Sequence, residues 1–294
     1  MKLQPWHHTT TAGFTLRGQH SPPSGRPVIH FLHGNGYCGL TYAPMLERLA
    51  EDFDLFLSDI QGHGDSDQGG RFHGWNRTAE FAAEAWRAQL AQFGDVPAYA
   101  VGHSFGSVIS CLMLAREPDL FARGAVLLDP VLFPPAMIGL MALSDVVGLL
   151  SRNTLASRAR KRRHHWPDRT AAYLGLQERG MFRGWHEDAL QAYVDHALRE
   201  SPAGGVELKC RPSREAEIFG SYPRRLWSSL ARVRTPTLVL RGDRSYPFAA
   251  KSIARWCAGN PAIREQLVPG GHCFMQETPD AAAAEIKRFL QALG

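Results

Sequence analysis

The pentapeptide Gly102-His103-Ser104-Phe105-Gly106 has the composition of a sharp turn that presents a reactive serine. A short apolar stretch, residues 98–101, precedes it, and an apolar helical pattern, residues 107–115, follows it. On such a strand-to-helix turn the residues two positions away must be small, because strand and helix approach each other there. The N-terminus of the helix also favours negative charge beside the serine. These residues predict that Ser104 is a nucleophile for acyl transfer.

A second glycine-rich turn, His33-Gly34-Asn35-Gly36, follows the apolar stretch of residues 27–32. Glycines allow the backbone of such a turn to approach a bound substrate closely. The backbone N–H groups of Asn35 and Phe105 are therefore predicted to hold an oxyanion. An ordinary tight turn without that role is the alternative.

Among the thirteen histidines, His272 has the best placement for a base. It follows two glycines after the last apolar stretch, and a base must meet Ser104 in space rather than in sequence. We expect His103 to point away and pack, His33 to orient its own loop, and His63 to be structural.

These pieces resemble the α/β-hydrolase superfamily, in the broad group that carries a helical cap. The motifs that carry the resemblance occur in the order of that superfamily: His33-Gly34-Asn35-Gly36, Asp59-x-x-Gly62-His63-Gly64-x-Ser66, Gly102-His103-Ser104-Phe105-Gly106 and Gly270-Gly271-His272. The resemblance covers nearly the whole chain except the cap. It implies an α/β-hydrolase fold and a serine hydrolase, but it says little about the substrate, because this fold supports many chemistries.

The acid that would support His272 has two candidate positions. The superfamily usually places it after the strand that precedes the histidine strand, three or four residues past a glycine, where this chain has Ser245 and Tyr246. Neither residue can serve as the acid, and Asp243 lies only one residue past the glycine. Some members, such as certain haloalkane dehalogenases, carry the acid after the strand that follows the nucleophile helix, and Asp129 occupies that position. We favour Asp129, with Asp243 as the alternative acid; a third reading is that Asp129 only caps the start of its loop.

The resemblance implies acyl-enzyme chemistry on a carboxylic ester, a lactone or a thioester. A serine nucleophile, in place of aspartate, disfavours halide displacement and epoxide opening. A hydrolase of carbon–carbon bonds in ring-cleavage products is one alternative. A non-catalytic receptor with the same fold is another, and a protein recruited through its basic segment is a third.

The elements that must position these residues alternate between strand-like and helical patterns. Apolar stretches predict strands at residues 27–32, 54–59, 98–101, 125–128, 237–240 and 264–268. Helical periodicity marks residues 78–93, 107–115 and 279–293. This alternation predicts an α/β fold with a mostly parallel sheet covered by helices on both faces, and functional residues at the carboxyl ends of the strands.

Residues 134–222 break that alternation and predict a helical cap, or lid, inserted into a core formed by residues 1–133 and 223–294. Residues 187–198 are amphipathic, as expected for a cap helix. We expect Tyr37, His33 and Trp185 to line a substrate pocket. The other aromatic residues of the segment either line that pocket or form the small core of the cap itself.

The composition of the chain limits which classes of protein and partner are compatible with the sequence. The chain has 294 residues, 44% of them hydrophobic and 21% charged, which is typical of a globular protein. No leader pattern and no long apolar stretch is apparent, and the five cysteines show no pairing pattern, so we expect a cytoplasmic protein with reduced thiols. The net charge of +5 owes much to residues 158–165, which we expect to be a solvated helix face. We expect a small-molecule, ester-like substrate, no metal or organic cofactor, no nucleic acid and no stable membrane insertion; a homodimer stays open.

Overall fold

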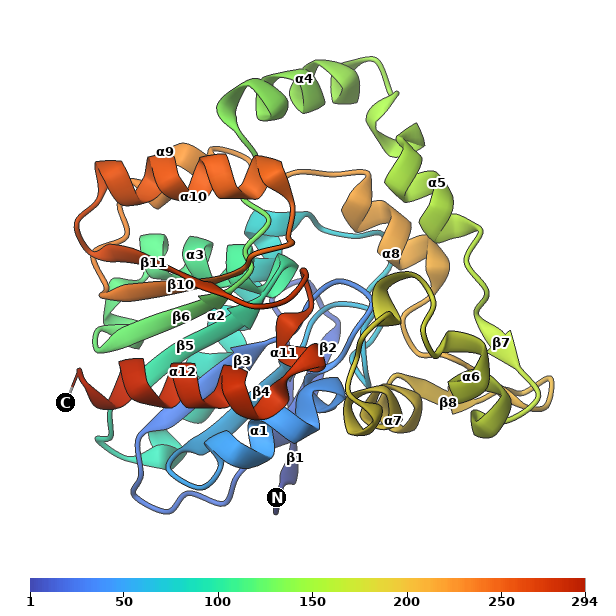
Figure 1. The fold of residues 1–294 in the computed structure, drawn as a ribbon, viewed down its shortest axis with the longest axis horizontal. Coiled ribbons are helices and arrows are strands. Elements are labelled where there is room, and N and C mark those ends of the chain that lie inside the picture. Colours follow the sequence, from blue (N-terminus) through green and yellow to red (C-terminus); the bar gives the residue numbers. More distant parts are fainter. Residues whose placement is uncertain (294) are drawn as a thin grey trace.

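The computed structural model describes residues 1–293. The strands of its main sheet are β1 (Gln4–Thr9), β2 (Thr15–His20), β3 (Val28–Leu32), β4 (Asp54–Asp59), β5 (Ala98–His103), β6 (Gly124–Leu128), β10 (Thr237–Gly242) and β11 (Ile263–Val268). Their spatial order is β1-β2-β4-β3-β5-β6-β10-β11 (Figure 1). All pairs from β4 to β11 are parallel, whereas β1 and β2 extend the sheet with antiparallel pairs. The prediction of a mostly parallel sheet is confirmed.

Helices cover both faces of this sheet. The helices that flank it are α1 (Ala43–Leu49), α2 (Trp75–Leu90), α3 (Phe105–Arg116), α9 (Leu226–Leu230), α10 (Pro247–Gly259), α11 (Phe274–Glu277) and α12 (Pro279–Gln291). One apolar cluster joins the sheet to α1 and α12, and a second joins its other face to α2, α3, α9 and α10. Strands β3, β4 and β6 are buried along their whole length, which explains why their sequences read as continuous apolar stretches.

Residues 134–222, between β6 and β10, contain five α-helices and a small separate sheet. The helices are α4 (Pro135–Val146), α5 (Thr154–Arg160), α6 (Arg169–Leu176), α7 (Glu187–His196) and α8 (Pro212–Phe219). Strands β7 (His165–Trp166), β8 (Leu198–Glu200) and β9 (Val206–Leu208) pair antiparallel in the order β7-β9-β8. The segment is mainly helical, and its three short strands were not predicted from the sequence. The division into core and cap at residues 134–222 stays a prediction.

Several elements were not predicted from the sequence. The hairpin β1–β2 was missed because it lies at the sheet edge, where only alternate side chains are buried and no apolar stretch results. Helices α1 and α10 also lie in stretches that gave no clear pattern. Across residues 1–293, every helix is too short or too polar to cross a lipid bilayer.

Candidate active site

Ser104 lies between β5 and α3, at the carboxyl end of the parallel strands. Its backbone has φ 54° and ψ −113°, a conformation that non-glycine residues rarely adopt. A Cβ atom at Gly102 would lie 2.7 Å from the carbonyl carbon of Gly106, and a Cβ at Gly106 would lie 2.2 Å from the oxygen of Leu32. Both glycines are therefore required by the close approach of strand and helix that the sequence predicted.

The structure brings Ser104, His272 and Asp129 into one hydrogen-bonded chain. The Oγ of Ser104 lies 2.8 Å from Nε2 of His272, and Nδ1 of His272 lies 2.5 Å from Oδ2 of Asp129. Because the Asp129 carboxylate can only accept, Nδ1 carries the proton and Nε2 is free to accept from the serine hydroxyl. This is the tautomer that a general base for Ser104 requires.

Asp129 comes from the end of β6, whereas Asp243 is directed elsewhere. Asp129 is 1% exposed, and it follows β6, which pairs with β5, the strand that precedes Ser104. The carboxylate of Asp243 accepts the N–H of Gly270 at 2.9 Å and is about half exposed. Within the part of the chain that the structure describes, no hydrogen bond joins Asp243 to His272. The geometry thus favours the first of the two candidate acids.

Ser245 contributes to the site in a way that the sequence did not indicate. Its hydroxyl donates a hydrogen bond to Oδ2 of Asp129, and the N–H of Gly242 donates to Oδ1 at 3.2 Å. Ser245 occupies one of the two loop positions at which the resemblance places an acid, and here that loop contacts the candidate acid Asp129. A serine hydroxyl gives no sequence signal for such a contact, which depends on the tertiary approach of two loops.

The backbone N–H groups of Asn35 and Phe105 are both without a hydrogen-bond acceptor among residues 1–293. The N–H of Ser104 itself donates to the carbonyl of Leu128 at 2.9 Å and is not available to a substrate. The side chain of Asn35 is used elsewhere, because its amide donates to the carbonyl of Glu215 at 3.2 Å. Two unused donors beside the serine fit the predicted oxyanion hole, whose catalytic role stays a prediction.

Two buried, neutral histidines hold the turn that carries Asn35. His33 donates through Nδ1 to the carbonyl of Gly34 at 2.8 Å and accepts the N–H of Ile60 through Nε2 at 3.1 Å. His63 accepts the N–H of Gly36 at 3.0 Å. Burial lowers the pKa of His33 to about 4 and that of His63 well below its ordinary value, so both accept hydrogen bonds at neutral pH.

The placement of His33 in the substrate pocket needs correction. Its ring is completely buried, and both ring nitrogens are bonded to backbone groups, so it has no polar atom to offer a substrate. Its contacts fit the other expectation for this residue, that it orients its own loop.

His103 also differs from expectation, because its ring does more than pack. It accepts a hydrogen bond from the Tyr42 hydroxyl through Nδ1 at 2.7 Å and donates through Nε2 to the carbonyl of His272 at 3.0 Å. The same hydroxyl accepts the N–H of Gly34 at 3.1 Å. Burial lowers the pKa of His103 well below its ordinary value, so the ring is neutral and one nitrogen can accept. This relay joins the turn of Asn35 to the loop of His272.

Aromatic side chains gather next to this relay. The rings of Tyr37 and Trp185 stack at 5.9 Å, and the Tyr37 hydroxyl lies 3.4 Å from the sulfur of Cys273. The ring of Tyr246 lies 4.8 Å from that of His272. The indole N–H of Trp185 is buried without a hydrogen-bond partner in residues 1–293. A pocket formed by Tyr37 and Trp185 stays a prediction.

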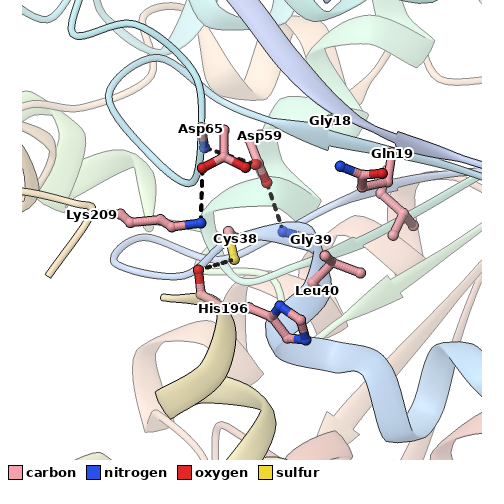
Figure 2. Close-up of a pocket in the computed structure, with 10 residues that line it drawn as sticks. Gly18, Gln19, Cys38, Gly39, Leu40, Asp59, Asp65, His196 and Lys209 are labelled. Carbon is pink, nitrogen blue, oxygen red and sulfur yellow. Dashed lines mark hydrogen bonds and ion pairs between the residues drawn. The ribbon is translucent and has the colours of Figure 1, made fainter. Parts of the chain in front are cut away.

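The Asp59-to-Ser66 motif lies at a small cavity of about 20 Å³ that Ser104 does not line. Figure 2 shows Asp59 directed at the N–H of Gly39, which it accepts at 2.8 Å, and Lys209 directed at Asp65, with which it forms an ion pair of 2.8 Å. Asp59 also accepts the N–H of Asp65 at 3.2 Å. The motif therefore ties the turn after Asn35 to the segment between β6 and β10. Burial raises the pKa of Asp59 to about 6.

Comparison with known protein families identifies the family to which this fold belongs. A family profile described as "Alpha/beta hydrolase family" matches residues 31–285. The chain belongs to the alpha/beta hydrolase family. This alpha/beta hydrolase is 26% identical over 273 residues to the 2-(acetamidomethylene)succinate hydrolase of Mesorhizobium japonicum, which covers 90% of this chain and 88% of the relative. It is also 26% identical over 286 residues to the magnesium-chelatase 30 kDa subunit of Rhodobacter capsulatus, covering 92% and 88% of the two chains.

Solved structures show the same fold. The crystal structure of E-2-(acetamidomethylene)succinate hydrolase superimposes on this alpha/beta hydrolase with a TM-score of 0.80 at 22% identity, over 99% of this chain and 100% of the other. The thioesterase domain from the curacin biosynthetic pathway gives a TM-score of 0.73 at 16% identity, over 99% and 100% of the two chains. At such identities the likeness concerns the fold alone.

Proposed function

We propose that this protein is a serine hydrolase that cleaves a carboxylic ester, or a lactone or thioester, through an acyl-enzyme intermediate. The observation that carries the proposal is the chain from Ser104 through His272 to Asp129, with contacts of 2.8 and 2.5 Å. Because Nδ1 of His272 donates to Asp129, Nε2 is left to accept the proton of the Ser104 hydroxyl.

The proposed cycle uses only groups of this chain and water. His272 takes the proton of Ser104 as Oγ attacks the substrate carbonyl, and the N–H groups of Asn35 and Phe105 hold the oxyanion. His272 then protonates the leaving alcohol or thiol as the bond to it breaks. A water molecule, deprotonated by His272, attacks the acyl-enzyme, and the proton returns to Ser104 as the acid product leaves.

The relatives support hydrolysis but do not select the substrate. Their names include a 2-(acetamidomethylene)succinate hydrolase, pimeloyl-[acyl-carrier protein] methyl ester esterases and a monoglyceride lipase. A hydrolase of carbon–carbon bonds in ring-cleavage products and a ligand receptor with this fold are the other candidates. For the substrate pocket we propose Tyr37 and Trp185, because the buried indole N–H of Trp185 has no acceptor among residues 1–293 and its ring stacks on that of Tyr37.

Covalent labelling tests the proposed nucleophile. A fluorophosphonate probe reacts with an activated serine, so wild-type protein is expected to label and Ser104→Ala to lose the label. Ser107→Ala is a matched control, because Ser107 lies in the first turn of α3, which begins directly after Ser104, and its hydroxyl donates to carbonyl oxygens. Labelling that survives in a folded Ser104→Ala variant contradicts the proposal.

Turnover then separates an enzyme from a receptor. Hydrolysis of p-nitrophenyl esters of increasing acyl length measures kcat/KM and the size of the pocket, with Ser104→Ala as the blank. A labelled but inactive protein that binds these esters would favour the receptor. Turnover of a ring-cleavage diketone, but of no ester, lactone or thioester, would favour the carbon–carbon hydrolase.

A further inference from the structure

Helix α4 exposes an apolar face that no other element covers. Although it is one of the more apolar helices of the chain, none of its residues is buried. Leu140 is 64% exposed, Leu143 65% and Val146 84%, and Met137 and Val147 are exposed beside them. The spacing 137, 140, 143 and 147 places these side chains on one side of the helix.

Such a face is unusual for a helix in contact with water. A surface helix ordinarily directs polar residues at the solvent and apolar residues at the core. In α4 the residues that face the protein, such as Ile138 and Met141, are only half-buried, while the outward side is apolar as well. Contiguous apolar surface of this kind marks a site of interaction with a partner or a membrane.

The neighbouring segment adds unpaired positive charge. Helix α5 packs its small residues Ala156 and Ala159 against Ala216 of α8, and Asn153 fixes its start by a hydrogen bond to the carbonyl of Phe219. The cations of this segment consequently lie outward. Five of them are exposed and form no ion pair within residues 1–293: Arg152, Arg158, Arg160, Lys161 and Arg163. Arg162, in contrast, is withdrawn into a pair with Glu215 at 2.7 Å.

Helix α5 follows α4 in the chain. Figure 1 shows α4 at the outer edge of the molecule, with α5 continuing from it down the upper right. Within α4 and α5 the one acidic side chain is Asp145. A helix that exposes leucine and valine next to arginine and lysine has the two features that draw a protein to an anionic bilayer: apolar side chains for the acyl boundary and cations for the headgroups.

We propose that α4 and the adjoining cations of residues 152–163 form a surface that docks this protein reversibly on anionic membranes. The leucines and valines of α4 enter the headgroup–acyl boundary, and the arginines and lysine contact lipid phosphates. The proposal does not depend on the reaction at Ser104, since none of these side chains belongs to that site.

Vesicle flotation tests the surface. The wild-type protein is expected to float with phosphatidylcholine vesicles that contain phosphatidylglycerol, and to release at high salt. Leu140→Gln/Leu143→Gln is expected to weaken binding by ~10-fold or more, because two exposed leucines no longer enter the bilayer. Arg158→Gln/Arg160→Gln/Lys161→Gln is expected to weaken it by roughly fivefold for each cation removed.

Matched controls and a second measurement keep the test decisive. Leu267→Gln and Arg264→Gln replace an exposed leucine and an exposed arginine of β11, and both are expected to bind like wild type. Binding that is absent, equally strong on pure phosphatidylcholine, or unchanged in the α4 variant overturns the proposal. So does light scattering that shows a dimer without lipid and a monomer for Leu140→Gln/Leu143→Gln, because α4 would then be covered by a second copy.

Discussion

The carboxylate of Asp129 is held from three directions: by His272, by the hydroxyl of Ser245 and by the N–H of Gly242. At 1% exposure it has little access to water, so these contacts replace its hydration. These three contacts fix the orientation of the carboxylate group. It can therefore keep the ring of His272 in the tautomer that faces Ser104.

Replacing Asp129 by asparagine is expected to remove most of the activity. The amide would direct N–H at Nδ1 of His272 or leave it without an acceptor, which favours the tautomer protonated on Nε2, and that nitrogen can no longer accept from Ser104. A loss in kcat of about 10⁴-fold is expected for such a change. Asp243→Asn is the matched control and is expected to keep kcat within a few-fold. Steady-state ester hydrolysis measures both; full activity in Asp129→Asn and a large loss in Asp243→Asn would reverse the assignment.

Sequence reasoning at this scale succeeded where the backbone imposes the residue type. The backbone geometry requires glycine around Ser104 and in the turn before His272, and these glycines can be recognised directly in the sequence. The contacts of His103 and Ser245 were not visible, because they depend on where a side chain points after folding. The choice between Asp129 and Asp243 stayed open for the same reason.

Among the elements, α3 approaches β3 so closely that no side chain fits between them. The closest approach is at Gly106, where an added Cβ would lie 2.2 Å from the carbonyl oxygen of Leu32 and 2.5 Å from that of His33. Both atoms belong to the backbone and cannot rotate away. The closeness also places Phe105, whose N–H is one of the proposed oxyanion donors, beside the turn of Asn35.

Gly106→Ala is expected to force α3 and β3 apart and to lower the free energy of unfolding by about 1–3 kcal/mol, or more. Gly139→Ala is the matched control, because Gly139 is an exposed glycine of α4 with no atom within 4 Å of the added Cβ. That substitution is expected to be neutral or to stabilise by up to ~1 kcal/mol, since alanine favours helix. Urea denaturation measures both variants; equal effects at the two sites would show that the close approach is unimportant.

Across the whole molecule, the sheet separates two apolar clusters, and its central strands are buried on both sides. This double burial produces the continuous apolar stretches from which the parallel sheet and its flanking helices were predicted. The edge hairpin β1–β2 lacks that signature because its strands are only partly buried, and the strands of the small sheet β7-β9-β8 are only two or three residues long. Neither gives a continuous apolar stretch, so the apolar pattern did not predict them.

The core also contains a histidine that must stay neutral. His30 of β3 stacks on Trp86 and Phe121, and burial lowers its pKa to about 3. In the unfolded chain the ordinary value of 6.5 applies, so the unfolded state binds the proton first as the pH falls. His30 therefore reduces stability as the pH drops from about 6.5 to about 3, and it has no such effect above that window.

Chemical denaturation of wild type and His30→Phe tests this dependence. The free energy of unfolding of wild type, relative to the variant, is expected to fall by roughly 1.4 kcal/mol for each pH unit below about 6.5. The variant loses the contact between His30 and Ser58, which shifts its stability at every pH but leaves the slope informative. A difference that is constant between pH 7 and pH 4 would contradict the assignment.

The position of Asp129 has a mechanical consequence for the proposed machinery. The N–H of Ser104 donates to the carbonyl of Leu128 and that of Asp129 to the carbonyl of Leu240, so the proposed nucleophile and acid are both tied to the ends of neighbouring strands. The loop of His272 is attached to the same end of the sheet through its carbonyl, which accepts from His103. Three backbone contacts thus tie the proposed serine, acid and histidine to one end of the sheet. In the proposed site, the loop after β10 supports the acid through the hydroxyl of Ser245 rather than supplying the acid itself.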